Sequence, residues 1–200
     1  MLIIFFLFLT FIILMKIYQN DIVGYIGERY TAKLIKEKIN CPVFTDVYIC
    51  GSRGVQQIDV IAVTPKGVLV IEKKTYIGLI VGRERDKQWK VFVNHGKQKY
   101  YMKNPHHQNY GHIQALCENF PNMKSLCIDL VVFGNNANLG DGIPYATICD
   151  ANFLWFYNNL PNVLSSQQIS EFTSAIQSLQ KDKSVNKALH KKKICEMKKR

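Results

Sequence analysis

Two runs rich in β-branched residues flank a short turn in the first half of the chain. The runs are Ile58 to Val63 and Val68 to Lys73, and Thr64-Pro65-Lys66-Gly67 joins them. Proline with glycine two positions later suits a tight turn between two strands. The segment therefore predicts a β-hairpin, which fixes where its polar side chains point.

Charged residues interrupt these otherwise apolar strands. Asp59 lies in the first run, and Glu72 and Lys74 lie at the end of the second. Ionised groups are costly in buried strands, so their presence calls for a reason. Because side chains alternate along a strand, Glu72 and Lys74 share one face and Lys73 takes the other. A four-residue turn also pairs Asp59 directly with Glu72, provided that Gly67 introduces no bulge.

The opposed carboxylates of Asp59 and Glu72 predict a metal site. Like charges across a ladder repel each other unless a counter-charge lies between them. Hard oxygen ligands favour Mg²⁺ or Mn²⁺, which would polarise a phosphate and lower the pKa of a bound water. Lys74 would orient that water or stabilise developing charge. The alternative is an ordinary salt bridge between Glu72 and Lys73 or Lys74.

The elements around the hairpin indicate one α/β domain, with a mixed central sheet flanked by helices. Asn104-Pro105 reads as a helix cap followed by proline in the first turn, and Ser165 with Gln168 as a capping box. In chain order we expect a helix from Asn20 or Asp21 to about Ile39, strands over 43–50, 77–82 and 88–94, a polar loop up to 103, a helix from 104, strands over 127–133 and 145–149, and helices over 151–159 and 165–181.

The first fifteen residues, Met1 to Met15, contain no charged side chain. As a helix they would span about 22 Å, short of the roughly 30 Å hydrocarbon core, but Lys16 and Tyr18 can extend the span by reaching the interface. A basic leader and a small-residue cleavage site are missing, which favours a retained anchor over a signal peptide or a buried core helix. Positive charges follow the segment, so the rest is expected in the cytoplasm as part of a single-pass membrane protein.

Basic residues gather at the other end of the chain. Residues 181–200 hold nine Lys or Arg residues against Asp182 and Glu196, which is +7 of the chain's net charge of +11. We expect a solvated or frayed helix that binds nucleic-acid phosphates or the anionic leaflet, or simply solubilises the chain.

The six cysteines form no C-x-x-C pair, which favours reduced cytosolic thiols over a zinc site or a disulfide framework.

At these residues the sequence resembles the nuclease-related domain (NERD) family, a branch of the PD-(D/E)XK phosphodiesterase fold. The resemblance spans about residues 22 to 135 and implies a restriction-endonuclease-like sheet. Its matching pieces follow the family's order and are Gly24 to Glu28, Gln57-Ile58-Asp59, Gly67 to Lys74, Gly78 with Trp89, Asn104-Pro105 with Gln108 and His112, and Val131-Val132-Phe133.

The resemblance assigns roles to particular residues. It implies that Asp59 and Glu72 bind the metal and that Lys74 is the catalytic lysine. Glu28 matches a helix glutamate that takes part in metal or water binding, and Gln108 matches a glutamine that holds the active site or the nucleotide. The alternative for Glu28 is a solvated charge beside Arg29.

Three further residues are candidates for binding nucleic acid or supporting the site. Asn104 and His112 flank Gln108 on the same predicted helix, where capping and core-polar roles are alternatives for all three. Lys73 departs from the apolar residue usual between the acid and the lysine, and its strand position directs it to the opposite face of the sheet.

Together these features predict a membrane-anchored, Mg²⁺- or Mn²⁺-dependent nuclease that acts on DNA or RNA. The alternative is a non-catalytic membrane-associated domain that binds nucleic acid or a protein on the same fold. The expected organisation is an anchor over 1–18, the nuclease-related domain over 20–150, helices packed on it over 151–180, and a basic tail over 181–200.

Overall fold

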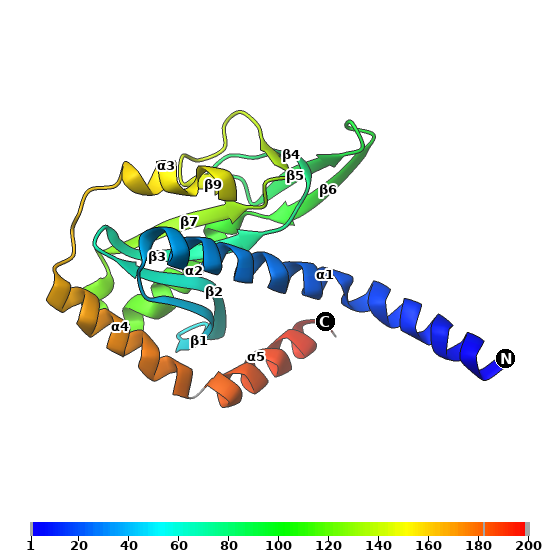
Figure 1. Cartoon of the computed structure of the whole chain (residues 1–200), viewed down its shortest axis with the longest axis horizontal. Coiled ribbons are helices and arrows are strands. Elements are labelled where there is room, and N and C mark those ends of the chain that lie inside the picture. The colour runs from blue at the N-terminus through cyan, green and yellow to red at the C-terminus, as the bar shows by residue number, and fades with distance from the viewer. Residues whose placement is uncertain (1, 182, 199–200) are drawn as a thin grey trace.

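The fold contains two mixed β-sheets flanked by helices (Figure 1). The computed structural model describes the backbone of residues 2–181 and 183–198, and the side chains of residues 19, 21–181 and 183–190. The prediction of an α/β domain is confirmed, but the strands divide into two sheets rather than one.

The first sheet has five strands in the order β1-β2-β3-β7-β9. The three leading strands are antiparallel, whereas β7 lies parallel to β3 and to β9, so the sheet is mixed as expected. Its strands are β1 (Val43–Gly51), β2 (Gly54–Thr64), β3 (Gly67–Lys74), β7 (Cys127–Phe133) and β9 (Thr147–Cys149).

The second sheet has four strands in the order β6-β5-β4-β8 and projects from one side of the molecule (Figure 1). Its strands are β4 (Gly78–Val81), β5 (Gln88–Val93), β6 (Gln98–Lys103) and β8 (Ala137–Leu139). The expected polar loop up to Lys103 is wrong, because residues 98–103 form β6 and pair with β5. One face of this sheet packs Trp89, Val91 and Met102 against Val131 and Phe133.

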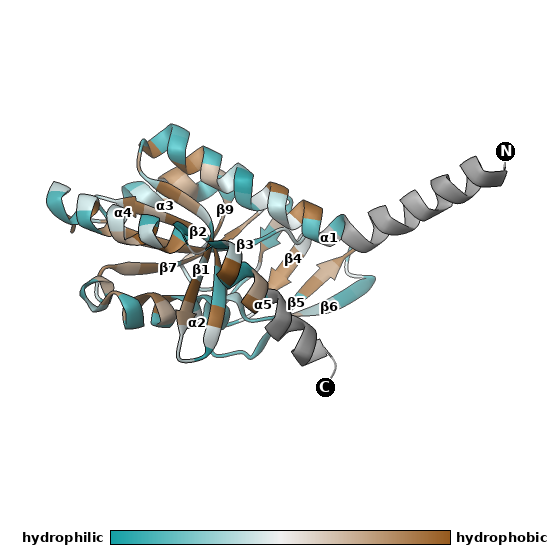
Figure 2. Ribbon diagram, turned by 90° about the horizontal axis from the view of Figure 1, so that it is seen from below, coloured by the Kyte–Doolittle hydropathy of each residue, from teal (hydrophilic) through white to brown (hydrophobic). Residues whose placement is uncertain are grey.

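Helices cover both faces of the first sheet, as the apolar clusters show. α2 (Pro105–Asn119) and α4 (Ser166–Lys181) pack on the face that presents Val68 and Val70. α1 (Leu2–Ile39) and α3 (Phe153–Asn158) cover the face that presents Leu69 and Ile71. Figure 2 shows the apolar strands between α1 and α2. Two short 3-10 helices, η1 (Pro121–Met123) and η2 (Asp150–Asn152), complete the connections.

Helix α1 begins earlier than expected. Its backbone is helical from Leu2, so the cap predicted at Asn20 or Asp21 is wrong, since both residues lie inside the helix. Across the part of the chain that the structure describes, no helix is both long and apolar enough to cross a membrane. The anchor expected over residues 1–18 lies outside the residues whose side chains are described, and it stays a prediction.

The basic C-terminal segment forms helix α5 (Lys183–Lys198). The beginning of this helix is not simply solvated, because it contacts the β1–β2 hairpin. Lys183 Nζ bonds to the Thr45 carbonyl at 3.3 Å, and His190 Nδ1 lies 3.0 Å from the Val55 carbonyl. The Tyr48 ring also meets the His190 ring edge-on. The segment is therefore partly built into the domain, beside the end of the hairpin.

Candidate active site

The β2–β3 hairpin holds the register that the turn predicts. Thr64 pairs with Gly67, and the ladder continues to Val60 opposite Ile71, so no bulge interrupts it. Gly67 has φ +134, and a Cβ there would lie 2.8 Å from the Leu126 carbonyl, so this position requires glycine. One step beyond the ladder, Asp59 comes beside Glu72.

Asp59 lies where the strand alternation breaks. Ile58 packs in the same apolar cluster as Ile61, although strict alternation would separate them. The neighbouring Asp46 on β1 has φ +53. Here the Asp59 carboxylate accepts a hydrogen bond from the Lys73 backbone N–H at 2.8 Å. The local irregularity thus ties the middle of β2 to the end of β3 and leaves Asp59 half-buried between the two strands.

Glu72 and Lys74 form an ion pair on the face covered by α2. Lys74 Nζ lies 2.6 Å from Glu72 Oε1 and 3.2 Å from Gln108 Oε1. His112 Nε2 lies 3.2 Å from Glu72 Oε2. Glu72 is only 1% exposed. Its two oxygens contact Lys74 and His112, which are both residues that the sequence singled out. The predicted strand parity is confirmed.

Gln56 extends this arrangement to β2. Its Oε1 lies 3.1 Å from His112 Nδ1, so the imidazole bridges Gln56 and Glu72. The sequence reasoning missed this residue, because the predicted strand began at Ile58 whereas β2 begins at Gly54 and includes Gln56.

Glu28 reaches the same region from α1. Burial, Asp46 and Glu72 raise the pKa of its carboxyl from 4.5 to about 7, against the lowering effects of Arg29 and Lys74. Close approach of α1 to β3 depends on Gly27, where a Cβ would lie 2.5 Å from Thr75 Cγ2. Gly24, the other glycine of this matched segment, has nothing within 4 Å of such a Cβ.

Burial and the neighbouring charges shift the pKa values of Asp59 and Lys74. Burial, Glu72 and Glu28 raise the pKa of Asp59 well above its usual range, although the Lys73 N–H and Lys74 lower it. The pKa of Lys74 is also raised, but for a different reason. Burial lowers it, but Glu72 and Asp59 outweigh that effect and raise it, so Lys74 stays charged.

A cavity of about 550 Å³ opens over these groups. Glu28, Asp59, Gln108 and His112 line it, so four of the predicted site residues share one space. Residues that the sequence did not single out also line it, including Arg53, Lys103, His107 and His190. His190 belongs to α5, so the basic C-terminal helix contributes a wall of the candidate site.

Asn104 has a structural role at the start of α2. Its Oδ1 accepts the His106 backbone N–H at 2.9 Å, which caps α2 as predicted. Its Nδ2 donates to the carbonyls of Glu84 and Asp86 at 2.9 and 2.8 Å. Asn104 therefore joins the start of α2 to the loop before β5, and at 1% exposure it has little surface for a ligand.

A second polar network lies beside α2. His106 bonds to Asp129 and Thr147 at 2.8 and 2.7 Å, and Asn109 Nδ2 bonds to Asp129 and to the Val70 carbonyl, both at 2.7 Å. The sequence carried a signal for it, since Asp129 interrupts the apolar run of β7.

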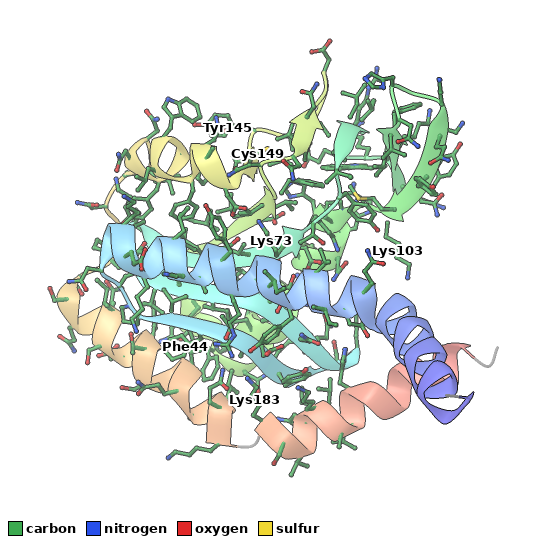
Figure 3. All side chains as sticks on the ribbon, turned by 45° about the vertical axis from the view of Figure 1, so that its right-hand side comes forward. Phe44, Lys73, Lys103, Tyr145, Cys149 and Lys183 are labelled. Carbon is green, nitrogen blue, oxygen red and sulfur yellow. The ribbon has the colours of Figure 1, made fainter. Side chains whose placement is uncertain are left out.

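Lys73 lies on the opposite face of the sheet, as strand parity predicts. Its Nζ lies 2.5 Å from Asp150 Oδ2, and Thr31 Oγ1 donates to Asp150 Oδ1 at 2.7 Å. Lys73 and Asp150 are 7% and 4% exposed. Figure 3 shows Lys73 between α1 and the segment that carries Cys149. Lys73 is thus removed from the cavity of the candidate site, and it anchors α1 and η2 to β3.

Among the residues whose side chains are described, no group of three or more His, Cys, Asp or Glu side chains is arranged to hold a metal ion. Asp59 and Glu72 therefore offer two acids rather than a closed cage. Each of the five cysteines in this part of the chain is a free thiol.

Comparisons with known proteins place these features in a wider context. The family model described as the nuclease-related domain matches residues 23–134. An uncharacterized protein of Bacillus anthracis is 36% identical over 83 residues, which is 42% of this chain and 38% of that relative. The chain thus spans well under half of that protein's length. No solved structure matches the chain.

Proposed function

The chain belongs to the nuclease-related domain family, which is of the PD-(D/E)XK nuclease-like kind, and we propose that it hydrolyses phosphodiester bonds of DNA or RNA with the help of a divalent metal. One observation carries the proposal. Glu72 and Lys74 form an ion pair that Gln108 and His112 hold, with Asp59 on the adjoining strand. This is the acid, acid and lysine set expected from the sequence, in a chain of this family.

The donor set fits Mg²⁺ or Mn²⁺. Asp59 and Glu72 offer hard carboxylate oxygens, and burial together with the neighbouring Glu72 and Glu28 carboxylates raises the pKa of Asp59, an effect that a bound cation would oppose. Mg²⁺ commonly binds through one or two carboxylates and keeps several waters, so two protein acids suffice. When bound, such an ion supplies charge that polarises a phosphate and lowers the pKa of a water.

The protein's own groups position and neutralise charge. Lys74 remains protonated beside Glu72 and is steadied by Gln108, so it can orient an attacking water or stabilise negative charge on a phosphate. His112 holds the second oxygen of Glu72, which fixes the orientation of that carboxylate. Glu28, with a pKa of about 7, can take up or release a proton near neutral pH.

The location of the domain is a further part of the proposal. The uncharged stretch over residues 1–15 supports an N-terminal membrane anchor, and the basic residues after it support a cytoplasmic domain. Helix α5 could place its lysines against the anionic leaflet or against nucleic acid near the site, since His190 from this helix lines the cavity.

A cleavage assay tests the activity. The full chain, kept in a mild detergent, is incubated with single- and double-stranded DNA and RNA in Mg²⁺, Mn²⁺ or EDTA. Cleavage should require the metal and should fall about 100-fold or more in Asp59→Ala and Lys74→Ala. Lys33→Ala is the matched control, because Lys33 is a 73% exposed side chain on α1.

Two results would count against the proposal. Cleavage that survives both active-site substitutions in a contaminant-free preparation would come from another source. Binding of nucleic acid without cleavage under any metal would instead favour the non-catalytic domain as the function of this fold.

A further inference from the structure

The outer face of the second sheet combines basic and aromatic side chains. Along β6, Met102 points into the core, so Lys99, Tyr101 and Lys103 share the opposite face. Tyr101 is 55% exposed, and the neighbouring Lys residues are exposed as well. The strand thus presents one aromatic ring between two positive charges.

The adjoining strand continues the pattern. Lys90 pairs with Tyr101, and Phe92 pairs with Lys99. Trp89 and Val91 fill the buried face of β5, which leaves Lys90 and Phe92 on the outer one. Rings and ammonium groups therefore alternate both along and across the two strands. Lys99 Nζ also lies 5.2 Å from the centre of the Tyr101 ring.

This face carries strong positive charge. The sequence from Lys87 to Lys103 contains five lysines and no acidic residue. Glu84 and Asp86 precede the segment, but the Asp86 carboxylate accepts the Arg83 backbone N–H at 2.9 Å in its own loop. A polyanion laid along β5 and β6 would meet complementary charge.

The face leads into the candidate active site. A groove of about 970 Å³ is lined by Lys87, Tyr101 and Lys103 together with His107 and Gln108. Its neighbour, the cavity over Asp59, is also lined by Lys103, His107 and Gln108. The two spaces therefore share three residues, and Figure 3 shows Lys103 at the end of β6 that carries this junction.

Resting on the proposed function, we infer that the outer face of β5 and β6 binds single-stranded nucleic acid and feeds it along the groove toward Lys74. Exposed aromatic rings stack on unpaired bases, whose faces a duplex hides, and the interleaved lysines neutralise phosphates. Lys99 to Lys103 spans about 13 Å of extended strand, so the face meets a continuous stretch of the ligand. Recognition through stacking and charge applies to single-stranded DNA and RNA alike.

Binding is measured by fluorescence anisotropy with labelled single-stranded DNA, single-stranded RNA and a blunt duplex, using the full chain in EDTA. EDTA prevents metal-dependent cleavage, so the measurement does not depend on activity. Tyr101→Ala should weaken single-strand binding about tenfold. Lys90→Ala and Lys99→Ala should each reduce the slope of log affinity against log salt by about 0.7.

Matched controls exist on the same strand and on another element. Tyr100 is 53% exposed but has the opposite strand parity, so Tyr100→Ala should change affinity less than twofold. Lys33→Ala removes an exposed charge from α1 and should leave the salt slope unchanged.

Three outcomes would overturn the inference. The first is equal loss in Tyr101→Ala and Tyr100→Ala. The second is tighter binding of the blunt duplex than of the single strands. The third is loss of binding to phosphatidylserine vesicles in Tyr101→Ala without any binding of oligonucleotides, which would assign the face to a membrane. If a chain that shows any of these results still cleaves in a metal-dependent way, the proposed function stands and only the inferred binding face fails. If the chain binds single strands through this face but never cleaves, the binding face stands and the proposed function fails.

Discussion

Lys74 Nζ lies 2.6 Å from Glu72 Oε1, on the face of β3 that α2 covers. The adjacent Lys73 points to the opposite face of the sheet, where it bonds to Asp150. Two consecutive lysines thus have separate surroundings, since Lys74 also bonds to Gln108 in the wall of the cavity, whereas Lys73 lies in a buried ion pair. Strand alternation alone accounts for the separation, and it makes the two residues distinguishable by experiment.

Removal of Lys73 should damage stability rather than chemistry. Lys73→Ala leaves the Asp150 carboxylate buried without its cation, which costs about 3–5 kcal/mol of unfolding free energy. The double variant Lys73→Met with Asp150→Leu removes both charges and should recover much of that loss. Urea denaturation measures both, with Lys33→Ala as the control. A cost in Lys73→Ala no larger than in the control would contradict a structural role for the pair.

Glu28 should make stability depend on pH. Its pKa is raised from 4.5 to about 7 in the folded chain, so the folded state binds the proton more tightly than the unfolded state. Stability must then fall as the pH rises between these values. Glu28→Gln should remove about 1 kcal/mol of that fall, a figure reduced for solvent screening of a partly exposed group. Urea unfolding from pH 4 to 8 measures it, and an unchanged pH profile in the variant would count against the assignment.

The two roles of Asn104 can be separated by substitution. Asn104→Ala loses the cap of α2 and the donor to the loop before β5, and should cost about 2–4 kcal/mol. Asn104→Asp keeps the capping oxygen but sets a carboxylate against the Glu84 and Asp86 carbonyls. It should therefore be destabilised nearly as much as the alanine variant in thermal unfolding. Near wild-type stability of Asn104→Asp would mean that the cap dominates.

His112 should act through Glu72. The imidazole holds Glu72 Oε2 and is itself held by Gln56, so its loss frees the carboxylate to rotate. Such supporting contacts typically contribute 10–100-fold to metal affinity. His112→Ala should therefore weaken Mn²⁺ binding by about that factor in calorimetric titrations. His95→Ala, at the exposed turn between β5 and β6, is the control. Equal affinities in the two variants would remove His112 from the site.

Local patterns in the sequence predicted much of the site. Turn chemistry set the β2–β3 register, and strand parity selected Lys74 over Lys73. The capping box at Ser165 is confirmed, since Ser165 N–H donates to Gln168 Oε1 and Gln168 N–H donates to Ser165 Oγ. Each of these features depends on residues a few positions apart, where propensity and sterics determine the outcome.

Features that depend on distant contacts were missed. Strand β6 is exposed at every residue except Met102, so its sequence lacks the apolar alternation of a half-buried strand, and pairing with β5 holds it. The partner of Lys73 lies 77 residues away in the sequence. The contact of His190 with the β1–β2 hairpin likewise needs the folded chain to become visible.

Titration with Mn²⁺ tests the central claim most directly, because it asks whether Asp59 and Glu72 share a divalent cation. Calorimetry on the full chain should give one Mn²⁺ site that Mg²⁺ competes for. Asp59→Asn and Glu72→Gln should each weaken it at least about tenfold, whereas Asp141→Asn, which changes an exposed acid, should not. An affinity that neither active-site substitution alters, or a wild-type chain that binds no Mn²⁺, would contradict the account.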